Sequence, residues 1–290
     1  MLSRFDRNIR FFGENGQKQL RSTHVAVVGI GGLGTHLVQQ LAFLGVGEMT
    51  LIDHEELDET NRNRYIGCRA EDPIPGTLKT SIGERLIKSI DPDIHVKPVN
   101  ENLVTEKGFS AVIGSDYVFG CLDTEGARMI LTELCAAYDK RYFDLASEIL
   151  PGEKTRYGGR ACFSYRGRGC LLCLGELDRQ EASLDIAGDE ARRQRDGIYG
   201  IDRKELGAGG PSVVTINGVV ASLAATEFML DVSAVRPAIQ LLKYYGHLGK
   251  VTVPVNQAEP DCYICKVQYG RKDDADVQHY IRDGFGKCRK

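Results

Sequence analysis

The sequence lacks the features that mark secreted, membrane-spanning and nucleic-acid-binding chains. Its first residues, MLSRFDRNIRFF, contain no apolar segment of signal-peptide length. The apolar stretch 213–230 is interrupted by Asn217, Thr226 and Glu227, which predicts a buried helix and not a membrane span. Lys plus Arg total 37 against 40 Asp plus Glu, so no basic field favours nucleic acid. We expect a cytoplasmic protein without membrane or nucleic-acid partners.

Internal repeats and low-complexity segments are also absent from the sequence. With 290 residues, the chain can bury one large α/β core or two smaller ones. Nine cysteines without a secretion signal indicate a reducing compartment, where paired cysteines bind metal more often than they form disulfides.

A glycine-rich turn between a strand and a helix is the strongest local signal. Residues 25–28 are β-branched and apolar, and the stretch 33–44 that follows has an apolar stripe at helical spacing. Glycines let the backbone approach a nucleotide, whose phosphates then face the free N–H groups of the helix. The alternative is a tight turn that only packs helix on sheet. The glycines of this turn are Gly29, Gly31, Gly32 and Gly34.

Asp53 ends the next predicted strand, 49–52, about 20 residues after the turn, where an acid can hold a ribose hydroxyl. The polar loop after it contains Asn61 and Arg64, and Lys79 follows. Each of these three side chains, taken alone, is typical of a solvent-exposed protein surface. Together, beside a phosphate turn, they offer two cations and an amide to a triphosphate.

Asp123 directly follows another predicted strand, 117–122. An acid at the carboxyl end of a strand faces the same crevice and is a natural Mg²⁺ ligand. The alternative is a helix N-cap for the predicted helix 124–138.

Two CxxC pairs, Cys170/Cys173 and Cys262/Cys265, predict a metal site. Four thiolates at this spacing fill a tetrahedral Zn²⁺ with no open position, so the zinc would be structural. The alternatives are four buried small hydrophobes or a redox CxxC. The remaining cysteines, among them Cys68, Cys121, Cys135 and Cys162, are expected to be mostly buried structural thiols.

The rest of the chain predicts an α/β fold: a Rossmann-like, mainly parallel sheet with flanking helices. We expect an N-terminal arm (1–23), a nucleotide-binding half (24–173), and a long charged, mobile crossover loop (174–210). A second half of the same domain (211–268) and a polar, poorly ordered tail (269–290) follow. Pro211 is expected to begin the long apolar helix, and strands are expected at 142–146, 159–165, 238–244 and 250–255.

Several segments together resemble one family, the ThiF/MoeB/ubiquitin-activating adenylyltransferases. They cover most of the chain in the family's order. The matching segments are RFDRNIRFFGENGQKQL, GIGGLG, LIDHEELDETNRNR, GTLKT, IDPDIHV, GCLDTEGAR, CLLC and CYIC.

The resemblance implies a Rossmann-like ATP site and a homodimer. The C-terminal glycine carboxylate of a ubiquitin-fold or sulfur-carrier partner would attack the α-phosphate and release pyrophosphate. Asp53 would hold the ribose, Arg64 and Lys79 the phosphates with Asn61 beside them, and Asp123 would bind Mg²⁺. Arg7 would reach the site from the other subunit. A sulfur donor or a conjugating enzyme is a possible downstream partner.

Two features depart from the family's pattern. Tyr65 follows Arg64 where the family commonly has Gln. Relatives that form a thioester or acyl disulfide usually carry a cysteine in the loop after the first CxxC, whereas residues 174–210 contain none. We therefore expect the reaction to end at the acyl-adenylate or to pass it to another molecule. Cys288, between Lys287 and Arg289, is the remaining candidate thiol.

Three other functions remain open from the sequence. The same site could adenylate a small peptide or an RNA-attached carboxylate. An NAD-dependent dehydrogenase would share the glycine turn but would leave Arg64, Lys79 and the CxxC pairs without a purpose. A non-catalytic binding module would not need the intact arginine, lysine and aspartate positions.

Overall fold

An eight-stranded mixed sheet forms the centre of the computed structural model, which describes residues 4–188, 210–255, 259 and 261–285. The strand order is β3-β2-β1-β4-β5-β6-β7-β8. Pairs among the first five strands are parallel, and β6, β7 and β8 join antiparallel. The Rossmann-like, mainly parallel fold expected from the sequence is confirmed. The strands are β1 (His24–Val28), β2 (Glu48–Ile52), β3 (His95–Val99), β4 (Tyr117–Gly120), β5 (Arg141–Leu150), β6 (Arg156–Ser164), β7 (Leu241–Tyr245) and β8 (Lys250–Thr252).

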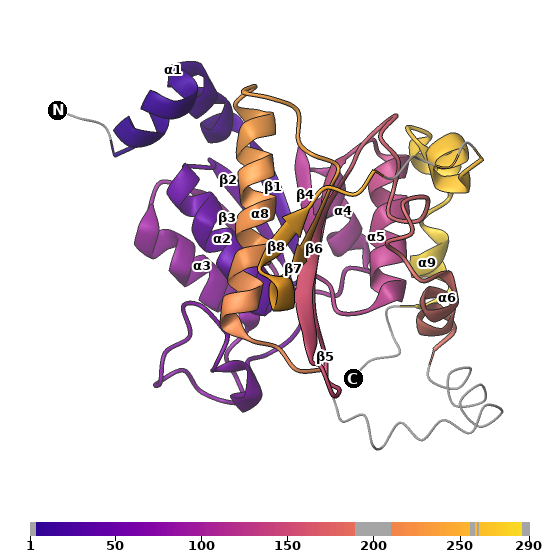
Figure 1. The fold of residues 1–290 in the computed structure, drawn as a ribbon, viewed down its shortest axis with the longest axis horizontal. Helices are drawn as coiled ribbons and strands as arrows, with labels where there is room; N and C mark the ends of the chain where they lie inside the picture. Colours follow the sequence, from indigo (N-terminus) through magenta and orange to yellow (C-terminus); the bar gives the residue numbers. More distant parts are fainter. Residues whose placement is uncertain (1–3, 189–209, 256–258, 260, 286–290) are drawn as a thin grey trace.

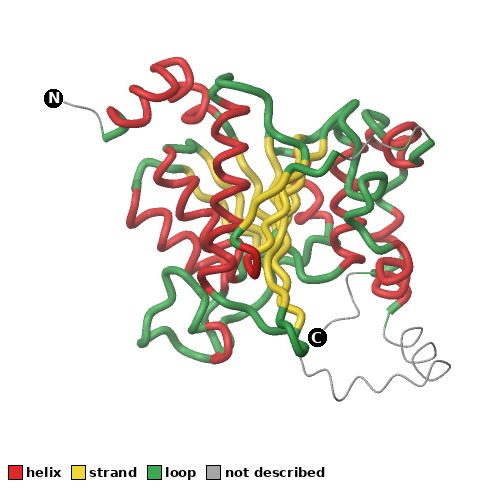
Figure 2. Tube along the Cα trace, in the orientation of Figure 1, coloured by secondary structure: helices red, strands yellow, loops and turns green. Residues whose placement is uncertain are grey.

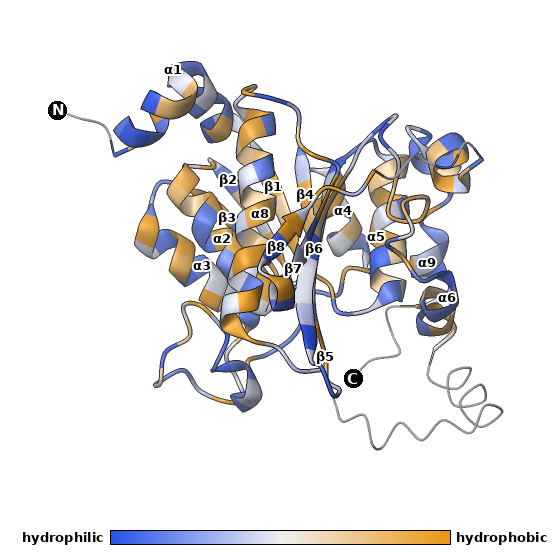
Figure 3. Cartoon of the chain, viewed as in Figure 1, coloured by the Kyte–Doolittle hydropathy of each residue, from blue (hydrophilic) through white to orange (hydrophobic). Residues whose placement is uncertain are grey.

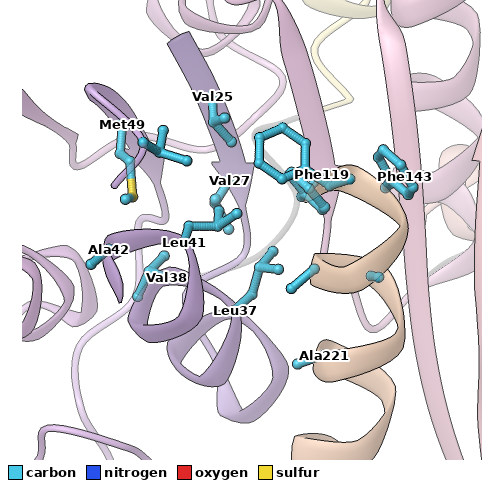
Figure 4. Close-up of a cluster of buried hydrophobic side chains, with 14 of the residues drawn as sticks. Val25, Val27, Leu37, Val38, Leu41, Ala42, Met49, Phe119, Phe143 and Ala221 are labelled. Atoms are coloured by element: carbon cyan, nitrogen blue, oxygen red, sulfur yellow. The ribbon is translucent and has the colours of Figure 1, made fainter. Parts of the chain in front are cut away.

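Helices cover both faces of the sheet, giving three layers (Figures 1 and 2). On one face lie α2 (Gly32–Leu44), α3 (Lys79–Ile90) and α8 (Val214–Val232); on the other lie α4 (Glu106–Ile113) and α5 (Glu125–Ala137). Successive residues of a strand point to opposite faces. Val25 and Val27 of β1 accordingly belong to the first core, with α2 and α8 (Figure 4), and Ala26 and Val28 to the second.

The long apolar helix α8 is a core helix. Among the described residues, it is the one helix long and apolar enough to cross a membrane. It packs on α2, β5 and β6 and buries nine side chains, and hydrophilic residues interrupt its apolar ones (Figure 3). It begins at Val214, so the prediction that Pro211 is its first residue was wrong. Val213 occupies the N-cap in extended conformation instead.

The order of the parallel strands reverses beside β1. The chain runs from β1 to β2 and β3 on one side, then returns to place β4 on the other. Open α/β sheets bind ligands at the carboxyl ends of the strands flanking such a switch point. The glycine turn follows β1, Asp53 follows β2, and Asp123 comes three residues after β4, so the fold brings these segments to one edge.

Two segments are more ordered than the sequence predicted. The expected mobile crossover loop contains α6 (Arg179–Ala187), capped by Asp178 and packed on α5; residues 189–209 lie outside the described part. The expected poorly ordered tail folds through residue 285, with a 3₁₀ turn (Lys272–Ala275) and α9 (His279–Arg282). The Tyr280 hydroxyl is buried and donates to Glu133 of α5 at 2.9 Å, which anchors this segment.

Strand ends also differ from the predictions. β5 continues to Leu150, beyond the expected end at residue 146, because it forms a long hairpin with β6. β8 ends at Thr252, although a strand was expected to 255. The N-terminal arm is the helix α1 (Asp6–Ser22), kinked at Gly13, where φ is 76°.

Candidate active site and four-cysteine cluster

A cavity of about 1180 Å³ opens at the carboxyl ends of β1, β2, β4 and β5. It collects side chains and backbone from the glycine turn, from the loop after β2 and from the loop after β4. Most of the site residues predicted from the sequence therefore lie together. Those that line the cavity are Gly29, Gly31, Gly32, Asp53, Asn61, Arg64, Lys79 and Asp123.

The glycine turn is built by close backbone contacts. Gly29 has φ of 90°, which favours glycine, and a Cβ there would stand 2.5 Å from the carbonyl oxygen of Cys121. Gly34 lies behind the cavity wall, where a Cβ would meet the Gly29 oxygen at 2.1 Å. These contacts let α2 begin directly at the end of β1, so its free N–H groups face the cavity.

Asp53 is tied to the same turn. One carboxylate oxygen accepts the Ile30 N–H at 2.7 Å, and the other accepts the Glu55 N–H at 2.9 Å. Burial raises the pKa of Asp53, and Lys79 and the two N–H donors oppose that rise. Each carboxylate oxygen can accept further hydrogen bonds, as binding a ribose would require.

Two cations line the cavity together with the glycine turn. Arg64 packs over Gly32, where a Cβ would lie 3.5 Å from the arginine side chain, and its guanidinium donates to the Thr60 carbonyl and to Asn63 at 3.2 Å. Lys79 begins α3, is buried, and forms an ion pair with Glu55. Both cations are therefore held at the cavity before any anion binds.

Asn61 and Tyr65 organise the loop that carries Arg64. Asn61 closes a capping box with Asp58, accepting the Asp58 N–H at 3.2 Å. Tyr65 is buried, and its hydroxyl donates to the carbonyl of Ile30 in the glycine turn. In the sequence, Tyr65 was notable only as a departure from the family's pattern. Its contact with the glycine turn could be recognised only in the folded structure.

Asp123 is exposed at the cavity, one residue before the N-cap of α5. That cap is Thr124, whose hydroxyl accepts the Ala127 N–H at 3.4 Å. The alternative interpretation, in which Asp123 caps the helix, is therefore wrong. An exposed carboxylate at this edge fits a hard cation such as Mg²⁺.

A second part of the cavity was missed by sequence reasoning. The end of β5 and the start of α8 close it with a chain of hydrogen bonds: Ser147 Oγ donates to Asn217 Oδ1 at 2.8 Å, and Asn217 Nδ2 donates to Ser212 at 3.1 Å. Asn217 is only 2% exposed, and a Cβ on Gly32 would touch it at 2.6 Å. Asn217 interrupts the apolar stretch 213–230, and that interruption was the available signal in the sequence.

The structure does not bring Arg7 to the cavity of its own chain. Arg7 is exposed on α1, and Gly16 of that helix packs on Ser233, which follows the end of α8. Asn217, near the start of α8, lines the cavity. The helix with Arg7 and the cavity therefore lie at opposite ends of α8, with α1 at the top of Figure 1.

The four predicted metal ligands converge. The Sγ atoms of Cys170, Cys173, Cys262 and Cys265 all lie within 4.8 Å of one another. Three of the distances are 3.9, 3.6 and 3.7 Å. Zn–S bonds of about 2.3 Å place tetrahedral ligands about 3.8 Å apart, so the cluster fits zinc. None of the four lines the cavity, as expected for a structural site.

The other cysteines differ from one another. Cys135 and Cys162 are buried, as predicted, whereas Cys68 and Cys121 are only partly buried. Cys121 lines the cavity, and burial raises the pKa of its thiol. A protonated thiol is a poor nucleophile. Cys288 lies outside the described residues.

Curated relatives are similar in sequence over most of this chain. It is 33% identical over 269 residues to the SAMP-activating enzyme E1 of Haloferax volcanii, covering 91% of this chain and 88% of that protein. It is 29% identical to the molybdopterin-synthase adenylyltransferase of Salmonella typhimurium, covering 87% of each. It spans only 58% of the Adenylyltransferase and sulfurtransferase UBA4 of Yarrowia lipolytica, at 25% identity over 88% of this chain.

Solved structures agree on the fold. The microcin C7 biosynthetic enzyme MccB superposes with a TM-score of 0.71 at 19% identity, covering 91% of this chain and 75% of that one. Residues 5–264 match the ThiF family. The chain is an adenylyltransferase of the ThiF/MoeB type and belongs to the ThiF family.

Proposed function

We propose that this enzyme uses ATP to adenylate the C-terminal glycine carboxylate of a ubiquitin-like or sulfur-carrier protein and releases pyrophosphate. The main observation in support of this proposal is the cavity in which the glycine turn, Arg64, Lys79 and Asp123 converge. Relatives named for SAMP activation and molybdopterin-synthase adenylylation support the substrate class.

The cavity has room for two substrates. Its volume of about 1180 Å³ lies above the range of roughly 300–1,000 Å³ typical of small-molecule sites. The glycine turn, Arg64 and Lys79 form the part suited to the nucleotide. The part of the cavity lined by Ser147 and Ser212 would then receive the end of an extended chain that brings a carboxylate to the phosphates.

The reaction needs alignment and charge neutralisation. A carboxylate with an ordinary pKa is already ionised at neutral pH, so no general base is required. Arg64 and Lys79 would hold the phosphates, with Asn61 beside them, and Asp53 would hold the ribose. Mg²⁺, held by Asp123, would neutralise charge that develops on the phosphates.

The product is expected to remain an acyl-adenylate until another molecule accepts it. Residues 174–210 contain no cysteine, and the cluster cysteines would be committed to metal. Cys121, at the cavity, has a raised pKa. We place the enzyme in the cytoplasm, where its nine cysteines stay reduced.

Changing Asp123 to Ala should abolish pyrophosphate–ATP exchange in the presence of a ubiquitin-fold protein ending in Gly-Gly. We expect a loss of at least about 100-fold, as for other preorganised charge-stabilising groups, with unchanged thermal unfolding because Asp123 is exposed. Asp93→Ala is the control: this exposed acid precedes β3 at the other end of the sheet. Exchange near the wild-type rate in Asp123→Ala would show that Asp123 does not bind the metal.

Zinc should be present at one ion per chain in protein purified under reducing conditions. Cys262→Ser should lose the ion and unfold at a lower temperature, because a closed site of four thiolates acts through folding. The loss in free energy of unfolding should exceed the loss in free energy of ATP binding. Cys68→Ser, a partly buried cysteine outside the cluster, should keep the zinc. Metal analysis that finds no zinc in the wild-type chain would refute the site.

A symmetric homodimer would complete each site with Arg7 of the second copy, since Arg7 does not line the cavity of its own chain. Neither Arg7→Ala nor Asp123→Ala should be active alone. Mixed, they should regain about a quarter of the wild-type activity, because random pairing makes half of the dimers hybrid and each hybrid has one complete site. No recovery despite proven subunit exchange would exclude Arg7 as a group acting in the partner's site.

A further inference from the structure

The buried guanidinium of Arg128 lies beneath the loop that carries Asp123. Arg128 is in the first turns of α5 and donates to the main-chain carbonyl of Leu122, the residue before Asp123. It also donates to the carbonyl of Leu145 at 3.1 Å. The pairing of β4 with β5 ends at Gly120 and Asp144. Arg128 therefore joins the two strands just where their own hydrogen bonds stop.

Arg128 is itself fixed by a buried ion pair. Its Nη1 lies 2.5 Å from Asp144 Oδ1, which also accepts the Tyr142 hydroxyl at 3.0 Å. The second Asp144 oxygen pairs with Arg160, whose Nε lies 3.2 Å from Glu176. Asp144 is fully buried and Arg128 is 5% exposed, so each charge depends on its partners for solvation.

This network holds Asp144 ionised. Burial alone would favour the neutral acid, but Arg128 and Arg160 outweigh that effect and lower the pKa of the Asp144 carboxyl. A permanent carboxylate keeps the Arg128 guanidinium oriented, because a charge-assisted hydrogen bond to a buried carboxylate is strong.

We propose that Arg128 is a positioning residue for the metal-binding Asp123. By holding the Leu122 carbonyl against the end of β5, it fixes the backbone from which the Asp123 carboxylate reaches the cavity. This inference rests on the proposed function only in taking Asp123 as the Mg²⁺ ligand. A lysine cannot replace Arg128, because its single ammonium lacks the planar set of donors that reaches Leu122, Leu145 and Asp144 together.

The test compares Arg128→Lys with Arg160→Lys. Arg160 binds the other oxygen of the same aspartate and contacts Glu176; within the described part of the chain, its side-chain hydrogen bonds and ion pairs do not reach residues 121–124. Calorimetric titrations with ATP at a series of Mg²⁺ concentrations, on the full chain, report metal-assisted binding without turnover. Thermal unfolding of each variant reports stability separately.

Arg128→Lys should raise the Mg²⁺ concentration for half-maximal enhancement of ATP binding by about tenfold, as loss of an outer-shell partner does at other metal sites. ATP affinity without Mg²⁺ should stay within about twofold of wild type, because Arg64 and Lys79 are untouched. Arg128 lies in the cavity wall, but its guanidinium is engaged by Leu122, Leu145 and Asp144. Arg160→Lys should keep the wild-type Mg²⁺ dependence even where its unfolding temperature falls. If Arg128→Lys does not fold, Arg128→Gln, which keeps an amide donor, should show the same shift.

Three results would overturn the assignment: an unchanged Mg²⁺ dependence in a folded Arg128 variant, an equal shift in Arg160→Lys, or a wild-type chain whose ATP binding ignores Mg²⁺. Pyrophosphate exchange in the same preparations addresses the proposed function separately. A wild-type chain that binds Mg²⁺-ATP but exchanges no pyrophosphate with any glycine-ended partner would contradict adenylation, while the calorimetry still decides the role of Arg128.

Discussion

The close contact between the glycine turn and Asp53 is the constraint on which the rest of the cavity depends. The Gly29 N–H donates to the Ile52 carbonyl at 2.9 Å, and the Ile30 N–H donates to Asp53 at 2.7 Å. This turn joins the carboxyl ends of β1 and β2 and allows α2 to start directly above them. A side chain at Gly34 would separate α2 from Gly29, and the surface offered to a nucleotide would be lost.

Local signals in the sequence were sufficient for the parts of the site that are local in structure. The glycine turn, Asp53 and the two CxxC pairs could be predicted, because a turn, a strand end and a metal knuckle are each encoded within a few residues. Arg128 could not be predicted as a site residue. Its proposed role depends on hydrogen bonds to Leu122, Leu145 and Asp144. The pairing of β4 with β5 is needed to bring these residues together around Arg128.

Order at the C-terminal end was missed for the same physical reason. The polar composition of residues 269–290 indicated a free tail, but a few apolar anchors decide whether such a segment folds. Val277 and Tyr280 are buried against the α5 side of the sheet, and Phe285 reaches the cavity wall. The start of the charged crossover segment is likewise held by a contact with a distant residue. Asp185 of α6 accepts the Gly126 N–H of α5 at 3.0 Å.

A calorimetric comparison of Mg²⁺-ATP with NAD, on the zinc-loaded full chain, tests most directly whether the cavity is a triphosphate site. Arg64 and Lys79 line the cavity together with the glycine turn, and two cations match the charge of a triphosphate better than that of a dinucleotide pyrophosphate. We expect binding of ATP that weakens with added salt, and negligible heat with NAD. Tight binding of NAD with none of ATP would contradict adenylation by this enzyme.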